Sequence, residues 1–535
     1  MTIRSRLARA GLAAALAIGG HLVGSGPGLA QAPGKSTLRV VPHADLRLLD
    51  PVATVTLITR MHGTLAYEAL FAWDSKFESK PMMVETHSVS PDNLTYTFKL
   101  RPGLKFHDGS PVTTDDVIPS IQRWMKRGLV GGTFASFAAG FEKVDDRTFT
   151  LKMKEPFGAT VLLLGGTTGT LPIVMRKKDA ETDAFQNITE AVGSGPFRFL
   201  KSEWVPGSKV VYEKNPDYIP RSEPTDGLAG ARIVKVDRVE YTIIPDAQTA
   251  ISALSRGEVD FLDSPRVDLL AQLKSNKDVT VDTLMNLDTY AHMRPNHLQP
   301  PFNNPKARLA LAAAIHQPDF MIATVGDDKK LWQECRSYYV CGSPNGIDAG
   351  TEDFKGQNLA KAKQLLAESG YKGEKVLLLS TQEIPIIASL SQVANAQLKA
   401  AGFNVEMAIF DWGAVVARTL KKDPVDQGGW SLFVTTAGGV YAFDPLVNTN
   451  TDMSCDGKNN VGWPCDEQVE KLRAQYVRTT DPARRKEVLT ALHKRLWETQ
   501  PTVLLGQFNP PSAWRSNVQG VLKTPITVFW NISKS

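Results

Sequence analysis

The apolar residues between positions 290 and 500 change repeatedly from a helical spacing to a strand spacing. Two helical stretches are each closed by a glycine and followed by an apolar strand: the helices span 359–369 and 388–401, the glycines are Gly370 and Gly402, and the strands span 376–380 and 405–410. Helices that alternate with strands pack as layers on a sheet. This half of the chain is therefore expected to form an α/β lobe with a mainly parallel sheet.

Two further helices of this region are marked by a capping residue followed by proline. Asn304 precedes Pro305, and Asp481 precedes Pro482 at the start of the last long helix. A short polar side chain accepts hydrogen bonds from the first helical turn, and proline fits the first position, where no amide donor is needed. Helices are therefore predicted to begin at these two prolines.

The first half of the chain is expected to be richer in strands. Residues 95–100 and 148–153 alternate strictly between apolar and polar side chains, which is typical of half-buried strands. A capping box, Thr113 with Asp116, predicts a helix between these two strands. Because no internal repeat and no long Pro/Gly linker divides the sequence, the chain is expected to cross between domains more than once.

The first 32 residues have the three parts of a secretory signal peptide. A basic start precedes an apolar run over residues 10–18, and the segment ends in Ala30-Gln31-Ala32. The apolar run is shorter than the roughly 20 residues that span a bilayer, which argues against the alternative of an anchor helix. We predict a signal peptide over residues 1–32, cleavage near Ala32 and a periplasmic protein. No cysteine lies near the cleavage site, so no lipid anchor is expected.

Charge and motif content argue against several function classes. The formal charge of +5 falls to +2, with 58 basic and 56 acidic residues, once Arg4, Arg6 and Arg9 of the signal peptide are removed. No basic stripe is visible, so nucleic-acid binding is not expected. The sequence has no G-x-S-x-G, H-E-x-x-H or Walker motif, so neither an enzyme nor a cofactor is predicted.

The sequence contains four cysteines, Cys335, Cys341, Cys455 and Cys465. An even number in an oxidising compartment favours disulfides, and three pairings are possible. Pairing the near neighbours, Cys335–Cys341 and Cys455–Cys465, closes two short loops, each worth roughly 2–3 kcal/mol. The alternative, a metal site, is disfavoured because no C-x-x-C and no suitably spaced histidine accompanies these thiols.

Short motifs spread along the chain resemble one protein family. They are Tyr67-Glu-Ala-Leu-Phe71, Asp92-Asn-Leu-Thr-Tyr-Thr-Phe-Lys-Leu-Arg-Pro-Gly-Leu-Lys-Phe-His-Asp-Gly-Ser110, Thr113-Thr-Asp-Asp-Val117, Gly193-Ser-Gly-Pro-Phe197, Asn215-Pro-Asp-Tyr218, Leu254-Ser-Arg-Gly-Glu-Val-Asp260, Pro300-Pro-Phe302 and Asp444-Pro445. In their order and spacing they are similar to the peptide/nickel-type extracellular solute-binding proteins of ABC importers, family five. The resemblance covers essentially the whole chain after the signal peptide.

The resemblance implies an α/β, two-lobed periplasmic binding protein fold of type II, in its large three-domain class, with a cleft between the lobes. The expected parts are lobe I over 33–75, 200–288 and 505–535, an extra domain over 76–199 inserted in lobe I, and lobe II over 289–504. Such a protein closes on its ligand about hinge strands. Its implied partners are a membrane permease and the ATPase of that permease, and it is expected to be a monomer.

The function implied by the resemblance is capture of a small solute for import, either a peptide or a peptide-like or modified amino-acid compound. Two alternatives from other classes stay open: a secreted hydrolase, and a ligand-binding sensor that reports to a membrane receptor. The resemblance also supports the pair Cys455–Cys465, because dipeptide-binding relatives have a comparable short loop after the Asp-Pro strand.

Seven residues are predicted to bind the ligand: His43, Arg294, Trp412, Thr435, Thr436, Gly438 and Tyr441. Most of them follow predicted strands, and α/β sheets bind ligands beyond their strand ends. Trp412 and Tyr441 are expected on the lobe II face of the cleft, with His43 opposite. Arg294 lies in the stretch that looks like the family's entry into lobe II and is expected near the hinge.

Two of these residues have an alternative role. Trp412 would otherwise pack under a surface helix, and Arg294 would otherwise form an interlobe salt bridge. If Arg294 reaches the cleft, it favours a ligand with a carboxylate, because the guanidinium fork matches that group.

One departure from the dipeptide-binding relatives bears on the ligand. Those relatives carry an acidic residue just before the Asp-Pro pair, and it binds the ligand's α-amino group. Here no acid lies between Thr435 and Asp444. A free α-amino group would lack a charged hydrogen bond worth about 1.5–3 kcal/mol. A simple dipeptide is therefore in doubt, and a modified peptide, an opine-like compound or an aromatic acid is at least as suitable.

Overall fold

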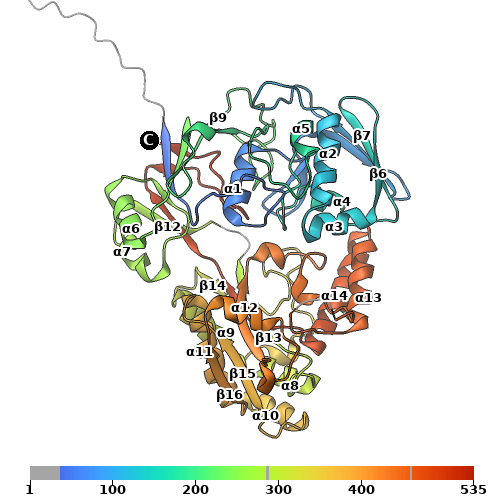
Figure 1. The fold of residues 1–535 in the computed structure, drawn as a ribbon, viewed down its shortest axis with the longest axis vertical. Helices are drawn as coiled ribbons and strands as arrows, with labels where there is room; N and C mark the ends of the chain where they lie inside the picture. Colours follow the sequence, from blue (N-terminus) through green and yellow to red (C-terminus); the bar gives the residue numbers. More distant parts are fainter. Residues whose placement is uncertain (1–35, 285–287, 458–460) are drawn as a thin grey trace, which may run out of the picture. The chain divides into compact units, whose positions relative to one another are not determined.

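The computed structural model describes residues 36–284, 288–457 and 461–535, which belong to one compact unit. The predicted signal peptide, residues 1–32, lies outside the described residues. Three larger sheets and the helices around them make up most of the fold (Figure 1).

A seven-stranded sheet is assembled from both ends of the chain. Its order is β12 (Val279–Thr283), β19 (Pro511–Arg515), β11 (Phe261–Leu262), β1 (Thr37–Val41), β10 (Arg238–Thr242), β9 (Lys209–Lys214) and β8 (Phe197–Phe199). The strand β1 runs parallel to β10 and β11, and the other pairs are antiparallel. The C-terminal strand β19 lies between β11 and β12, so the chain returns to this sheet near its end.

A second, antiparallel sheet contains the strands that were predicted from strict alternation. Its order is β4 (Val84–Val89), β5 (Thr95–Leu100), β7 (Thr148–Met153) and β6 (Ala138–Lys143). The apolar residues of β5 and β7 are buried and alternate with more exposed polar ones, which confirms both predicted strands. The predicted capping box starts α2 (Thr114–Met125), where the Asp116 carboxylate accepts the Thr113 backbone N–H at 3.0 Å.

The third sheet has six strands, in the order β14 (Trp332–Gln333), β18 (Val503–Phe508), β13 (Thr289–Pro295), β17 (Leu432–Ala437), β15 (Lys375–Ser380) and β16 (Asn404–Ile409). The predicted helices around it are confirmed as α8 (Pro305–Ala314), α10 (Leu359–Glu368), α11 (Pro385–Ala400) and α14 (Pro482–Thr499). Asn304 and Asp481 cap α8 and α14 with their side chains. In Figure 1 α9 (Gln317–Val325) and α11 lie along this sheet.

The prediction of a mainly parallel third sheet is wrong. Only β15 with β16 and β15 with β17 pair in parallel, and the other three pairs are antiparallel. The helix–strand alternation was read correctly for β15 and β16. The chain, however, enters this sheet along β13 and leaves it along β18, so these two neighbours must run in opposite directions.

The remaining elements are short or lie at the edges of the sheets. They are α1 (Leu57–Ala66), β2 (Phe71–Trp73), β3 (Ser79–Pro81), α3 (Gly128–Phe137), α4 (Thr160–Leu164), α5 (Lys177–Ala180), α6 (Ala247–Arg256), α7 (Leu270–Lys274), α12 (Trp412–Thr419), α13 (Glu467–Arg478), β20 (Val518–Gln519) and β21 (Ser533–Lys534). No helix among the described residues is both long enough and apolar enough to cross a membrane.

The sheets bear on the predicted limits of the lobes. The strand β8 pairs with β9 in the seven-stranded sheet although it falls in the predicted extra domain, and β18 spans the predicted limit at residue 504. The strand β8 has only three residues, and β18 is buried throughout and so lacks the alternation that would have shown its extent. The lobe limits stay a prediction. The pairing of β8 and β18 would shift two of these limits.

The chain passes between the seven-stranded and six-stranded sheets along two neighbouring paths. One runs from β12 to β13 and the other from β18 to β19, and β12 pairs with β19 while β13 pairs with β18. Beside these paths the Asp288 carboxylate accepts a hydrogen bond from the Asn509 amide at 3.0 Å. Two such connections between the same pair of sheets are the arrangement expected of a hinge.

Both predicted disulfides are present. The structure joins Cys335 to Cys341 and Cys455 to Cys465. No group of three or more potential metal ligands occurs among the described residues.

Buried histidines make the stability of the fold dependent on pH. His493 on α14 is buried, its Nδ1 donates to the Ala349 carbonyl at 2.6 Å, and its Nε2 accepts the Tyr338 N–H at 3.2 Å. Burial lowers the pKa of His493 to about 4. The unfolded chain therefore binds the proton more readily, so this contribution to stability is present above about pH 6.5 and is lost as the pH falls below it.

Replacing His493 by Gln should flatten the dependence of stability on pH. Between pH 7 and pH 5 the variant should lose about 2 kcal/mol less unfolding free energy than the wild type, because the titrating group is gone. Denaturant unfolding at both pH values measures this difference. Equal slopes for His493→Gln and wild type would contradict the prediction.

Candidate ligand-binding site

A cavity of about 430 Å³ lies between the six-stranded sheet and segments from the first half of the chain. Its volume is within the range of small-molecule sites. The lining residues are Val55, Gly128, Val130, Gly169, Thr170, His292, Arg294, Trp412, Val415, Val416, Thr419, Phe433, Thr435, Thr436, Ala437, Tyr441, Val447, Thr449, Asn450 and Val461.

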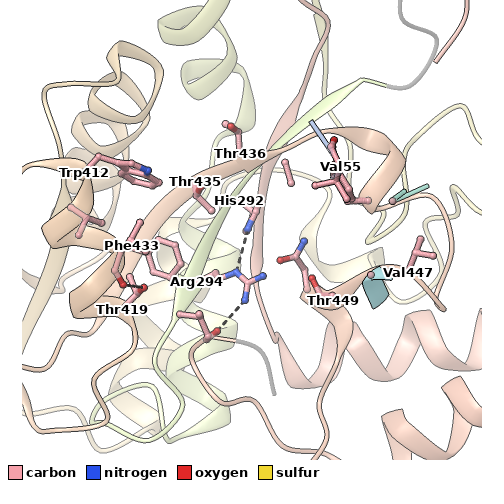
Figure 2. Close-up of a pocket in the computed structure, with 18 of the residues that line it drawn as sticks. Val55, His292, Arg294, Trp412, Thr419, Phe433, Thr435, Thr436, Val447 and Thr449 are labelled. Carbon is pink, nitrogen blue, oxygen red and sulfur yellow. Dashed lines mark hydrogen bonds between the residues drawn. The ribbon is translucent and has the colours of Figure 1, made fainter. Parts of the chain in front are cut away.

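Strand β13 places Arg294 and His292 in the wall of this cavity. The two residues are two apart on the strand, so their side chains leave the same face of the sheet. Their partners in β17 are Phe433 and Thr435, which also line the cavity. Figure 2 shows Arg294 near the centre of this group. A bulge in the pairing with β18 lies next to His292, and bulges turn side chains at such points.

The guanidinium of Arg294 is held by backbone and side-chain acceptors. Its Nη1 donates to the Val461 carbonyl at 3.0 Å, and its Nε donates to His292 Nε2 at 3.4 Å. The side chain is buried, with 7% of the residue exposed. Burial lowers the pKa of Arg294 to about 10, so the group still carries its positive charge at neutral pH.

His292 is a neutral hydrogen-bonding group at this site. Burial and the adjacent Arg294 charge hold the pKa of His292 well below its ordinary value. Because Nε2 accepts from Arg294, the neutral ring carries its proton on Nδ1. Nδ1 is buried and has no hydrogen-bond partner among the described residues.

Helix α12 forms an apolar wall. Trp412, Val415, Val416 and Thr419 recur at helical spacing and all line the cavity, so one face of the helix is directed toward it. The Asp411 side chain caps this helix by accepting the Ala414 N–H at 2.8 Å.

The opposite wall comes from the first half of the chain, and it was not among the predicted site residues. It includes Gly169 and Thr170 of the run Gly165-Gly-Thr-Thr-Gly-Thr170. The hydroxyls of Thr167, Thr168 and Thr170 are buried and have no partner in the described part of the chain. A glycine- and threonine-rich loop after a short helix is the signal that could have identified this wall.

Tyr441 connects the two walls directly. Its hydroxyl donates to the Val55 carbonyl at 3.0 Å, although the two residues are 386 positions apart. Further contacts join the same two parts of the molecule: the Arg478–Glu155 ion pair at 2.7 Å and the tilted contact between the Trp73 and Phe443 rings, whose centroids are 4.4 Å apart.

The structure brings five of the seven predicted residues to one cavity. Arg294, Trp412, Thr435, Thr436 and Tyr441 line it, and Gly438 lies next to the lining residue Ala437 without lining it. Their role in ligand binding stays a prediction.

The prediction that His43 faces Trp412 and Tyr441 is wrong. His43 lines a different cavity of about 320 Å³ and contacts the buried Asp263 carboxylate at 2.5 Å. The physical reason is that β1 lies inside the seven-stranded sheet, and its end opens beside α6 rather than toward α12.

The acid of the Asp-Pro pair, Asp444, is not available to a ligand. Asp444 is buried and its carboxylate accepts hydrogen bonds from the Tyr476 hydroxyl at 2.9 Å, the Leu446 N–H at 2.9 Å and the Asn345 amide at 3.2 Å. It does not line the cavity. Among the described residues that line it, Arg294 alone has a formal charge.

The comparison with known proteins matches this architecture. Residues 78–460 match the model of the middle part of bacterial extracellular solute-binding proteins, family 5. The chain belongs to this family.

Individual proteins match over 90% or more of this chain. A "probable peptide ABC transporter periplasmic-binding protein y4tO" of Sinorhizobium fredii is 37% identical over 100% of both chains. The glutathione-binding protein GsiB of Pectobacterium atrosepticum is 27% identical, over 90% of each chain. The crystal structure of the substrate-binding protein CtaP of Listeria monocytogenes aligns with a TM-score of 0.80 and 22% identity, covering 94% of this chain and 99% of that one. The predicted family and fold class are confirmed.

Trp412 should contribute strongly to ligand affinity in this family 5 protein. Trp412→Ala removes a large aromatic surface from the cavity wall and should weaken binding well over tenfold, since anchor aromatics are often worth about 2 kcal/mol. Titration calorimetry with a compound that co-purifies with the protein measures the effect. Leu420→Ala is the matched control, because Leu420 follows α12 directly, is 65% exposed and does not line the cavity; equal affinities of the two variants would contradict the prediction.

The disulfide Cys455–Cys465 should also affect binding. It closes the segment that contains Val461, whose carbonyl holds Arg294. Replacing both cysteines by Ser should destabilise this segment by about 3 kcal/mol in the chain-entropy model and weaken ligand binding. The corresponding change at Cys335 and Cys341 removes a loop of similar size outside the cavity lining, and should lower the melting temperature with less effect on affinity. A larger loss of affinity in that control would refute the prediction.

Proposed function

We propose that this protein is the periplasmic substrate-binding component of an ABC importer, and that it captures a peptide or a peptide-like compound. Membership of family 5 carries the proposal, together with a relative of matching length whose name assigns it to peptide ABC transport. The cavity supports it, because its aromatic and apolar walls and few polar groups are typical of small-molecule sites.

Capture proceeds by closure of the two sides of the cavity. The walls belong to parts of the chain that are connected by the neighbouring paths β12–β13 and β18–β19. Rotation about these paths separates α12 from the wall that contains Gly169 and Thr170 without unfolding either sheet. A bound ligand contacts both walls and therefore favours the closed state, which is the general condition for a ligand-driven change.

The closed protein docks on a membrane permease and its ATPase, which release and transport the ligand. The protein acts as a monomer in the periplasm after removal of the signal peptide predicted over residues 1–32. Transport rather than chemistry is the role of the cavity. His292 is held neutral and its Nε2 accepts from Arg294, so it is poorly placed to activate a nucleophile as a general base requires.

The experiment is recovery of a ligand from protein purified from the periplasm. Native mass spectrometry should find a bound small molecule, and returning it at a hundredfold excess over its dissociation constant should stabilise the protein by about 2.7 kcal/mol. The recovered molecule should be chemically unchanged after incubation. Deleting the gene should abolish uptake of that molecule.

Other results would exclude this function. A chemically altered molecule would show a secreted hydrolase. Unchanged uptake in the deletion strain would show a sensor instead of an importer component.

A further inference from the structure

The electrostatic character of the cavity is unusual for a site that receives peptides. A free peptide is a zwitterion and brings one positive and one negative terminus. The cavity offers Arg294 for the negative group, and none of its described lining residues is acidic. A buried ammonium group without a carboxylate partner is strongly disfavoured, whereas a carboxylate beside a buried guanidinium is favoured.

The hydrogen-bonding groups near Arg294 also favour a negatively charged group on the ligand. His292 is a wall residue whose Nδ1–H has no acceptor among the described residues. Arg294 and His292 come from alternate positions of β13, so two donors leave the same face of the strand. Two such donors suit a carboxylate and offer nothing to an ammonium group.

Asp444 cannot supply the missing negative partner. Its carboxylate already accepts three hydrogen bonds and lies 3.6 Å from the Arg485 guanidinium. Exposing this carboxylate to a ligand would break those bonds inside the fold. A small movement would therefore not bring the Asp444 carboxylate into the cavity lining.

We propose that this cavity selects a solute that has one carboxylate and no ammonium group, such as an N-acylated or lactam form of an amino acid or short peptide, and that Arg294 is the residue that sets this specificity. The proposal rests on the proposed function and names its substrate class. A single cation matches a single carboxylate better than a group of higher charge. The carboxylate binds to the Arg294 guanidinium, which Figure 2 shows among the lining residues.

The rest of the cavity defines the body of the ligand. Trp412, Val415 and Phe433 give an apolar surface on one side. The buried Thr170 hydroxyl on the other side has no partner in the described structure and can bond a carbonyl or hydroxyl of the ligand. A neutral amide or lactam fits between these walls, because it offers polar atoms to the hydroxyl without carrying a charge.

The test uses four forms of one dipeptide, Ala-Phe: the free dipeptide, its N-acetyl form, its C-terminal amide, and the N-acetyl amide. Binding is measured by titration calorimetry on ligand-free protein. The N-acetyl dipeptide with a free carboxylate should bind at least tenfold more tightly than the free dipeptide. The two amides, which lack the carboxylate, should bind more weakly than the N-acetyl acid by a similar factor or more.

Variants at Arg294 test whether this residue causes the preference for a free carboxylate. Arg294→Met should abolish the preference for the N-acetyl acid over the N-acetyl amide, and Arg294→Lys should retain part of it, because the charge stays while the fork is lost. Circular dichroism and the melting temperature report whether each variant folds. If Arg294→Met does not fold, the Lys variant and the four wild-type affinities still decide the question.

The outcomes separate this inference from the proposed function. Equal or tighter binding of the free dipeptide, or an Arg294→Met variant that keeps its preference, would overturn the specificity while leaving a solute-binding protein. The proposed specificity would also be overturned if the wild-type protein bound a cationic or neutral compound but neither the N-acetyl acid nor any other carboxylate compound. Failure of the proposed function has a different signature, namely an altered ligand or unchanged uptake.

Discussion

The pairing of β13 with β17 and β18 is the constraint on which the rest of the structure depends. The strand β13 brings the chain into the six-stranded sheet, and its neighbour β18 carries it out, so the hinge region and the sheet centre are parts of the same pair. The same strand also presents Arg294 to the cavity. A change that disturbs this pairing would therefore affect both the connection between the two sheets and the position of Arg294, and under the proposed function it would couple ligand binding to closure.

Burying a guanidinium in a cavity wall is unfavourable unless its hydrogen bonds are satisfied. None of the described residues that line the cavity is a carboxylate. The Val461 carbonyl and the neutral His292 ring accept from Arg294, and both are uncharged. These two hydrogen bonds leave the positive charge of the guanidinium unchanged, and that charge attracts an anionic ligand.

Much of the fold was predictable because it depends on local sequence. The alternation in β5 and β7, the caps at Asn304 and Asp481, and the near-neighbour disulfides each act within a few residues. Strand direction in the six-stranded sheet was not predictable in this way, because it depends on where the chain enters and leaves. Resemblance to family 5 supplied the long-range arrangement that local patterns do not contain.

The candidate site was also predictable from the sequence only in part. Trp412 and Tyr441 follow strands of the six-stranded sheet, and the rule that ligands bind beyond strand ends placed both at one cavity, whereas Thr435 lies within β17. His43 obeys the same rule in the seven-stranded sheet, yet its strand end opens elsewhere, because each sheet has its own edge and sequence does not say which edges face each other. The wall with Gly169 and Thr170 belongs to no strand, so a strand-based rule could not find it.

The position of Asp444 explains how one fold can serve ligands of different charge. The Asp-Pro pair is retained, but its carboxylate is used to hold Tyr476 and Asn345 and does not line the cavity. The loop between β17 and this pair, residues 438–443, has no charged side chain, and it brings Tyr441 to the cavity wall. The formal charge among the described lining residues comes instead from Arg294 of β13. The charge of this cavity is therefore set by a strand in the centre of the six-stranded sheet and not by the loop that precedes Asp444.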